Sequence, residues 1–293
     1  MSIKNIEVLR GLYEIHAPSM KEKKIRNYLK HKIVTRGATY QQDGIGNLLV
    51  TKGKSDTYPC VVAHLDQVQM SHPKDFRTII FDDTIIGRSD KHKQQYGLGA
   101  DDKNGIWIAL NCLERFDNIK VAFFVGEEVG CVGSSQVDLD FFKDCRFIIE
   151  PDRRGGSDLI TMMSGIQVCS NEFIQDIPYL EYGYREEQGS FTDILTLLER
   201  GVGISCLNLS CGYYHPHTDS EITVLSELEN CQRFVFDIIE NCTKTYPYEY
   251  KNPYALSDKE WLDMYYSEYV DEYNYNDWDS WYDYEKKNRY KYR

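Results

Sequence analysis

The chain has 293 residues, of which 42% are hydrophobic and 27% are charged, a composition typical of a globular protein. The formal net charge of −12 argues against nucleic acid and anionic membranes as partners. Charges interrupt the first twenty residues throughout, and no apolar run approaches the roughly 18 to 20 residues that span a membrane. We therefore expect a cytoplasmic protein without nucleic-acid or membrane partners.

Nine cysteines are scattered from Cys60 to Cys242, and none of them forms a CxxC pair. An odd number at wide spacing favours reduced, mostly buried thiols over a disulfide framework. This agrees with a reducing cytoplasm.

Residues 3–35 show the apolar periodicity of helices, with a break at Ala17-Pro18-Ser19. Ser19 and Glu22 have the spacing of a capping box, which predicts that a second helix starts there. Residues 48–51 and 59–63 then read as short buried strands.

A hairpin turn around residues 54–56 is predicted to join these two strands. The polar, glycine-containing stretch 71–99 is predicted to form loops and a short edge strand.

Apolar runs alternate with helical patterns over the rest of the main body. In chain order, we predict a helix at 103–113, strands at 121–125 and 147–149, a helix at 191–200, a strand at 204–209 and a helix at 224–239. This alternation predicts a three-layer α/β/α sandwich around a mixed, largely parallel twisted sheet. Ligands of such sheets bind beyond the C-terminal ends of the strands.

The composition changes near residue 246, where tyrosines become dense among Asp, Glu and Trp. We therefore divide the chain into a main domain, 1–245, and a C-terminal extension, 246–293. Ser257 and Glu260 predict at least one helix in the extension. It would either pack on the main domain, which we favour, or provide a surface for self-association.

Histidines and carboxylates recur just after predicted strands, after a glycine turn and at one predicted helix start. In chain order they are His64-Leu-Asp66, Asp101-Asp102, Glu127-Glu128, Glu150-Pro-Asp152 and His215-Pro-His217. These residue types are the ligands of Zn²⁺, Co²⁺ and Mn²⁺. Two such metals with a shared carboxylate suit hydrolysis. Each motif alone has an ordinary structural explanation, such as a charged helix start, so their joint order is the informative signal.

That order resembles the co-catalytic zinc exopeptidases, a superfamily that includes peptidase T, carboxypeptidase G, aminoacylases and several aminopeptidases. The matching segments are Ala63-His-Leu-Asp66, Gly99-Ala-Asp-Asp-Lys-Asn-Gly105, Gly126-Glu-Glu-Val-Gly130, Asp152 and His217-Thr-Asp-Ser-Glu221. Residues 98–105 look closest to peptidase T. The resemblance covers roughly residues 1–240.

The resemblance implies a site for two divalent metals, with zinc as the default and cobalt or manganese as alternatives. His64 and Asp152 would bind one metal, Glu128 and His217 would bind the other, and Asp101 would bridge them.

The same resemblance implies two catalytic residues. Glu127 would be the general base that takes a proton from the water between the metals and passes it to the leaving amine. Asp66 would fix the tautomer of His64. The Asp101-Asp102 peptide bond is expected to be cis.

At two of the ligand positions a second residue nearby could bind the metal instead. Glu150 and Asp152 lie at the end of one predicted strand, and some relatives use the Glu of a Glu-Pro pair. The run from Asp152 to Gly155 matches the Asp-Gly-Gly of peptidase T better, which favours Asp152. His215 competes with His217, but the spacing to Glu221 favours His217.

The chain departs from peptidase T in one respect. Its relatives insert a lid, or dimerisation, domain between the last two ligand motifs, whereas only residues 153–216 separate them here. We therefore predict no lid. Six residues are candidates for contact with the substrate, although structural pairing is the favoured explanation for the charged ones: Arg153, Arg154, Arg185, Asp193, Tyr213 and Tyr214.

The predicted function is a metal-dependent exopeptidase of small peptides, and the lidless core favours an aminopeptidase. One alternative is an amidase or deacylase of N-acyl amino acids that uses the same site. Another is an inactive relative that serves as a binding module. The second alternative is disfavoured because every ligand position, and Glu127, carries a compatible residue.

Overall fold

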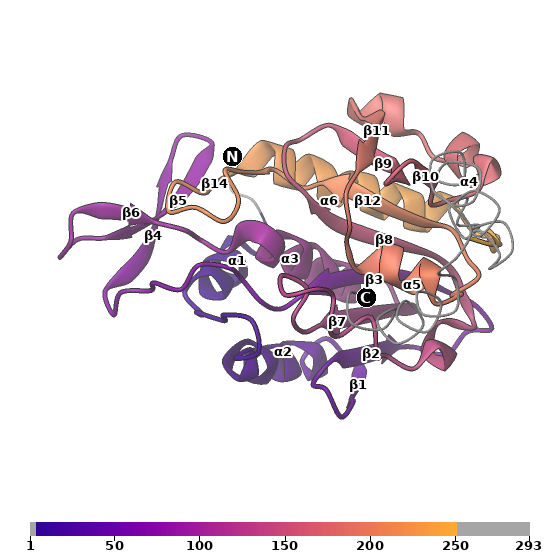
Figure 1. Cartoon of the computed structure of the whole chain (residues 1–293), viewed down its shortest axis with the longest axis horizontal. Coiled ribbons are helices and arrows are strands. Elements are labelled where there is room, and N and C mark those ends of the chain that lie inside the picture. Colours follow the sequence, from indigo (N-terminus) through magenta and orange to yellow (C-terminus); the bar gives the residue numbers. More distant parts are fainter. Residues whose placement is uncertain (1–3, 251–293) are drawn as a thin grey trace, which may run out of the picture. The chain divides into compact units, whose positions relative to one another are not determined.

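A computed structural model describes residues 4–250 of the chain (Figure 1). The predicted helix at Ser257 and the predicted self-association surface lie outside these residues. Among them, no helix is long and apolar enough to cross a membrane. All nine cysteines lie within the described part, and all nine are free and buried, as predicted.

The main sheet has nine strands. They are β1 (Thr39–Gln42), β2 (Leu48–Lys52), β3 (Tyr58–His64), β7 (Ile119–Phe124), β8 (Cys145–Arg153), β9 (Asp158–Met163), β10 (Ile166–Gln167), β11 (Arg185–Gly189) and β12 (Cys206–Ser210). Their order is β1-β2-β7-β3-β8-β12-β9-β10, and β11 pairs with β9. The central strands β7, β3, β8 and β12 run parallel, so their C-terminal ends share one edge of the sheet.

Both faces of this sheet are covered, which gives the predicted three layers. The helices are α1 (Ile6–Tyr13), α2 (Lys23–Val34), α3 (Ala100–Arg115), α4 (Asn171–Asp176), α5 (Asp193–Glu199) and α6 (Leu225–Asn241), with short 3₁₀ turns η1 (Leu139–Phe142) and η2 (Tyr179–Tyr182). Val61 and Ala63 of β3 face the core beneath α1, α2, α3 and α6, whereas Cys60 and Val62 face the core beneath α5. Because both faces are buried, β3 is buried along its whole length, and residues 59–63 are apolar without alternation.

A smaller five-stranded sheet lies beside the first. It is formed by β4 (Phe76–Phe81), β5 (Thr84–Ser89), β6 (Gln94–Tyr96), β13 (Tyr213–Tyr214) and β14 (Ile222–Val224). The prediction of loops and one short edge strand over 71–99 is therefore wrong. Burial alternates along β5, and β14 pairs with it from the far end of the chain.

The predicted hairpin around 54–56 is also wrong. Strands β2 and β3 do not pair, because β7 lies between them and binds both. The partner of β2 on its other side is β1, which was not predicted.

The predicted capping box at Ser19 is not formed. Helix α2 begins at Lys23, and no side chain caps its first turn. The backbone of residues 17–19 is instead tied to the segment after β3, since the Gln67 amide donates to Ala17 O at 3.0 Å. The Glu22 carboxylate accepts the Met20 amide at 2.7 Å. Tertiary pairing thus delays the start of the helix by about one turn.

Residues 153–216 contain no separate domain. Strands β9, β10, β11 and β12 all belong to the main sheet, so the predicted absence of a lid is confirmed for this stretch. The short strands β9 to β11 themselves were not predicted.

Candidate active site

The shared edge of the central strands gathers the residues that the sequence singled out. Strand β3 ends at His64, and Asp66 follows two residues later. Glu127 and Glu128 follow β7, and Asp152 lies near the end of β8. Asp101 lies in the first turn of α3, and His217 lies in the turn between β13 and β14. The topology therefore brings together all five predicted metal ligands, as well as Glu127 and Asp66.

Asp101 lies between two groups of ligand atoms. Its Oδ1 is 2.9 Å from His64 Nε2, and that nitrogen is 3.7 Å from Asp152 Oδ2. Its Oδ2 is 3.2 Å from His217 Nε2, and that nitrogen is 3.1 Å from Glu128 Oε1. The carboxylate of Asp101 therefore belongs to both groups of ligand atoms, with one oxygen in each.

The chemistry of these donors fits divalent metal ions. Ligand atoms of His64, Asp101 and Glu128 all lie within 4.8 Å of one another. Imidazole nitrogen and carboxylate oxygen are the donors that zinc, cobalt and manganese accept. The buried Nδ1 of His64 has no hydrogen-bond partner among the described residues and lies 3.4 Å from Asp66 Oδ1. A ring bound through Nε2 would direct its other nitrogen towards such a carboxylate.

The potential ligand atoms of His64, Asp102 and Asp152 also lie within 4.8 Å of one another, and they form a second group. Both oxygens of Asp102 are already engaged, however. They accept the backbone amides of His64 at 3.2 Å and Gly105 at 3.0 Å. Asp102 therefore anchors the start of α3 to the end of β3, and Asp101 remains the carboxylate that faces both histidines. The peptide bond between these two aspartates is cis, as predicted.

The turn that presents Asp101 is held by Glu221, a fully buried carboxylate. Glu221 accepts the amide of Gly99 at 2.6 Å, the amide of Asp101 at 3.3 Å and the side chain of Gln69 at 3.2 Å. Gly99 has φ of 62°, a conformation that glycine adopts without strain. Glu221 therefore supports the turn that carries Asp101, whereas His217, at the start of the same sequence segment, is itself a predicted ligand.

Glu127 faces the cluster, with Oε2 4.0 Å from His64 Nε2. The pKa of Glu127 is raised to about 9, mainly by burial; His64 opposes this shift, and the carboxylates of Asp193, Glu128 and Asp101 add to it. A cation bound among these acids would lower this pKa, because it would stabilise the ionised form.

The two histidines respond to the same acidic surroundings. Burial alone would lower the pKa of His64, but Asp152, Asp101 and Asp66 hold it well above its usual value. Hydrogen bonds to Asp101 and Glu128 raise the pKa of His217 to about 10. The carboxylates at this sheet edge therefore outnumber the positively charged groups that the protein places beside them.

Unlike Asp152, Glu150 belongs to neither group of potential ligand atoms that lie within 4.8 Å of one another. Its Oε2 accepts hydrogen bonds from Thr192 Oγ1 at 2.7 Å and from Asn208 Nδ2 at 3.1 Å. The geometry therefore favours Asp152 over Glu150 as the ligand from β8.

A cavity of about 450 Å³ opens above the cluster. Its walls are formed by Asp101, Glu127, Glu128, Asp152, Arg153, Arg154, Ile160, Met163, Gly189, Ser190, Phe191, Thr192, Asn208, Tyr213, Pro216 and His217. Four carboxylates, two arginines and a histidine share this lining with a few apolar side chains. It is of a size that suits a small organic ligand.

Several other candidates lie outside this cavity. Asp193 is fully buried and accepts a hydrogen bond from Ser134 Oγ at 2.5 Å. Tyr214 donates to Glu227 at 2.8 Å. Arg185 is exposed at the start of β11, and His215 does not line the cavity.

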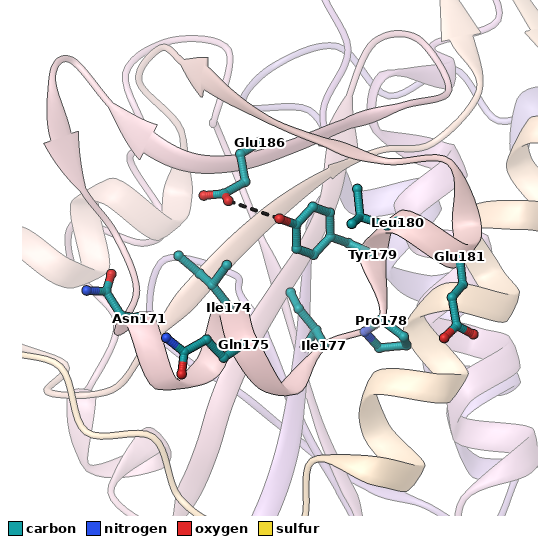
Figure 2. Close-up of a pocket in the computed structure, with 9 residues that line it drawn as sticks. All are labelled: Asn171, Ile174, Gln175, Ile177, Pro178, Tyr179, Leu180, Glu181 and Glu186. Atoms are coloured by element: carbon teal, nitrogen blue, oxygen red, sulfur yellow. Dashed lines mark hydrogen bonds between the residues drawn. The ribbon is translucent and has the colours of Figure 1, made fainter.

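A second hollow, of about 520 Å³, lies around α4 and η2 (Figure 2). Ile174, Ile177 and Leu180 make it mainly apolar, and Tyr179 donates a hydrogen bond to Glu186 at 3.1 Å across it. Its walls contain no histidine or cysteine, so it offers nothing comparable to the cluster at the sheet edge.

Sequence reasoning missed a buried network behind the site. Lys103 Nζ donates to Gln67 Oε1 at 2.6 Å, and Gln67 donates to Gln69, which donates to Glu221. Only Lys103 and Glu221 carried a signal, as members of matching motifs.

No protein-family model matches the sequence, and no curated protein matches it either. Solved structures with a similar fold do exist. Aminopeptidase PepT of Bacillus cereus has a TM-score of 0.65 and 15% identity, over 82% of this chain and 98% of its own. A tripeptidase of Staphylococcus aureus has a TM-score of 0.62 and 15% identity, over 81% and 97%. An aminopeptidase of the archaeon Desulfurococcus kamchatkensis has a TM-score of 0.60 and 16% identity, over 80% and 94%.

These likenesses confirm the predicted fold class. The mixed, largely parallel sheet with helices on both faces is the fold of exopeptidases such as these.

Proposed function

We propose that this chain is a metal-dependent exopeptidase that cleaves small peptides, with cleavage from the amino end favoured. The observation that carries the proposal is the position of Asp101, whose two oxygens face His64 and His217 in two adjacent ligand groups. The peptidases that share the fold support the same class of reaction.

In this proposal, His64 and Asp152 would hold one divalent metal, Glu128 and His217 would hold a second, and Asp101 would be shared between the two sites. Zinc is the default ion, and cobalt or manganese would accept the same donors. Two such ions, when bound, polarise the scissile carbonyl and lower the pKa of water.

The chain's own residues would then transfer the protons of the reaction and orient the metal ligands. Glu127 accepts a proton from the attacking water and later gives it to the nitrogen of the leaving amine. Asp66, whose Oδ1 lies 3.4 Å from Nδ1 of His64, would accept the proton of that nitrogen and so keep Nε2 directed at Asp101. The cavity admits a small peptide, because about 450 Å³ lies within the range for small-ligand sites.

The experiment is an assay for free amino acids released from unblocked, N-acylated and C-amidated peptides. The protein would first be stripped with a chelator and then reloaded with zinc, cobalt or manganese. Release that needs a free amine, returns with metal and falls at least about 10²-fold in Glu127→Gln supports the proposal. Glu187→Gln, an exposed site on β11, is the matched control.

Other outcomes would redirect the assignment. Cleavage of N-acyl amino acids alone would indicate a deacylase on the same site. Cleavage that persists in the Glu127→Gln protein would show that Glu127 is not the general base. No cleavage of any peptide, with metal bound, would contradict the exopeptidase proposal.

A further inference from the structure

Two arginines, Arg153 and Arg154, follow Asp152 directly and line the cavity above the ligand cluster. Their charges are not equivalent. Arg153 Nε lies 3.2 Å from Asp158 Oδ2, so a neighbouring carboxylate compensates it. Arg154 is exposed, and among residues 4–250 no carboxylate lies within ion-pair distance of its guanidinium.

The backbone that carries Arg154 is fixed to the end of β12 and the segment that follows it. Arg154 O accepts a hydrogen bond from Ser210 Oγ at 2.7 Å. On either side of it, Arg153 O accepts the amide of Cys211 at 2.9 Å, and the amide of Gly155 donates to Tyr213 O at 2.8 Å. The stem of this arginine therefore starts from a rigid turn, which reduces the entropy lost when its head group binds a ligand.

The charge balance of the cavity then determines what Arg154 would attract. Four carboxylates line it: Asp101, Glu127, Glu128 and Asp152. Two divalent cations in the proposed ligand groups would offset these four charges. The guanidinium of Arg154 is the charge that remains, so the loaded cavity favours a ligand with a negative group beyond its scissile bond.

We propose that Arg154 binds the C-terminal carboxylate of the substrate, which restricts this site to short peptides with a free carboxyl end. The inference rests on the proposed exopeptidase function, because it places the substrate between the ligand cluster and Arg154. Guanidinium suits this role, since its paired N–H groups match the two oxygens of a carboxylate. A longer chain, or an amidated one, presents no charge at that position.

The test is equilibrium binding of trialanine and of trialanine amide to the zinc-loaded Glu127→Gln protein, by calorimetry. We expect trialanine to bind about 10- to 100-fold more tightly than its amide, as lost charge-assisted hydrogen bonds imply. Adding Arg154→Ala should remove this preference and leave the amide's affinity unchanged. Arg154→Lys should restore part of it. Arg185→Ala, which deletes an exposed charge on β11 outside the cavity, is the matched control and should behave as the parent.

Binding and turnover separate the two proposals. Equal affinity of the parent for trialanine and its amide, or a preference that survives Arg154→Ala, overturns the role of Arg154. In the protein with Glu127 intact, Arg154→Ala should raise KM for trialanine without a similar fall in kcat. If the parent's preference depends on Arg154 while no peptide is cleaved, the carboxylate site stands and the exopeptidase proposal fails.

Discussion

The carboxylate of Asp66 accepts a hydrogen bond from the backbone amide of Glu127 at 3.0 Å, although the two residues lie 61 positions apart in the chain. The same oxygen is 3.4 Å from His64 Nδ1. The other oxygen accepts the amide of Glu128 at 3.3 Å. One buried side chain thus aligns a proposed metal ligand on β3 with the proposed base and a second ligand after β7.

Asp66→Asn tests this alignment. An amide has one acceptor oxygen where the carboxylate has two and carries no charge, so it cannot orient His64 and bind both backbone amides as well. We expect zinc affinity to fall about 10- to 100-fold, as is typical when a partner of a ligand is lost. Competition with a chromophoric chelator measures this, with Asp56→Asn at an exposed turn as the control. Unchanged zinc affinity would contradict the role of Asp66.

The choice between Asp152 and Glu150 can be made by counting metal ions. Asp152 Oδ2 faces His64, whereas Glu150 Oε2 is occupied by Thr192 and Asn208. Asp152→Asn should therefore lower the bound zinc from two ions per chain towards one. Glu150→Gln should leave it at two, because Gln keeps an acceptor oxygen for the same partners. Elemental analysis after gel filtration gives the count, and the reverse pattern would assign Glu150 as the ligand.

Glu221→Gln probes the turn that presents Asp101. The carboxylate receives the amides of Gly99 and Asp101 and the side chain of Gln69. A glutamine would turn an NH₂ group towards one of these donors and leave it unsatisfied in a buried place. We expect a loss of about 1–3 kcal/mol in the free energy of unfolding. Urea denaturation measures it, and a change no larger than that of Glu187→Gln would show that the turn is held by other contacts.

The candidate ligands could be singled out in the sequence because several of them follow apolar runs, and their roles came from the resemblance of the motif order to the zinc exopeptidases. Strands of that kind become parallel and buried, and the shared edge of the sheet then fixes where the next residues lie. Asp152 and Glu150 could not be separated in this way, since both stand near the end of β8. Their difference depends on Thr192 and Asn208, which come from other elements.

What the sequence could not predict depends on pairing between distant segments. Strand β14 has three residues and joins β5 from the opposite end of the chain. Ser19 has the local signal of a helix cap, yet the backbone before it is paired with Gln67. In each case a tertiary contact outweighs a local preference of about 1 kcal/mol or less.

His72 provides a prediction about pH. The pKa of His72 is lowered from its ordinary value to about 4, mainly by burial and also by the positive charges of Lys103 and the nearby His16. The unfolded chain therefore takes up this proton first as the pH falls below about 6.5. Stability that His72 contributes at neutral pH is lost progressively between about pH 6.5 and 4.

Replacement of His72 by glutamine removes this titration. Urea unfolding at pH 7.5 and pH 5.0 should show a smaller loss of stability in His72→Gln than in the parent chain. His16, which stacks on His72 at 5.1 Å between ring centres, also has a lowered pKa and retains its share of the effect. Equal losses in the two proteins would mean that His72 is protonated at the same pH in the folded and unfolded states.

Tyr246 stands where the composition of the chain changes, and its side chain is buried. Its ring packs on Phe173 at 4.5 Å between centres, and its hydroxyl donates to Asp176 at 2.7 Å. Its amide donates to Arg146 O at 2.9 Å, and its carbonyl accepts the amide of Ser205 at 2.8 Å. The chain therefore continues to pack on the main sheet at the residue where its composition becomes rich in tyrosine.

Tyr246→Ala should cost about 3–5 kcal/mol in the free energy of unfolding, as for other large aromatic side chains removed from a core. Tyr246→Phe keeps the ring and loses only the bond to Asp176, so about 0.5–1.5 kcal/mol is expected. Thr245→Ala, at the exposed neighbour, should be close to neutral. A Tyr246→Ala protein as stable as the Thr245→Ala protein would place the end of the folded main body before residue 246. The expected losses would place that end beyond it, because the ring of Tyr246 would then be part of the core.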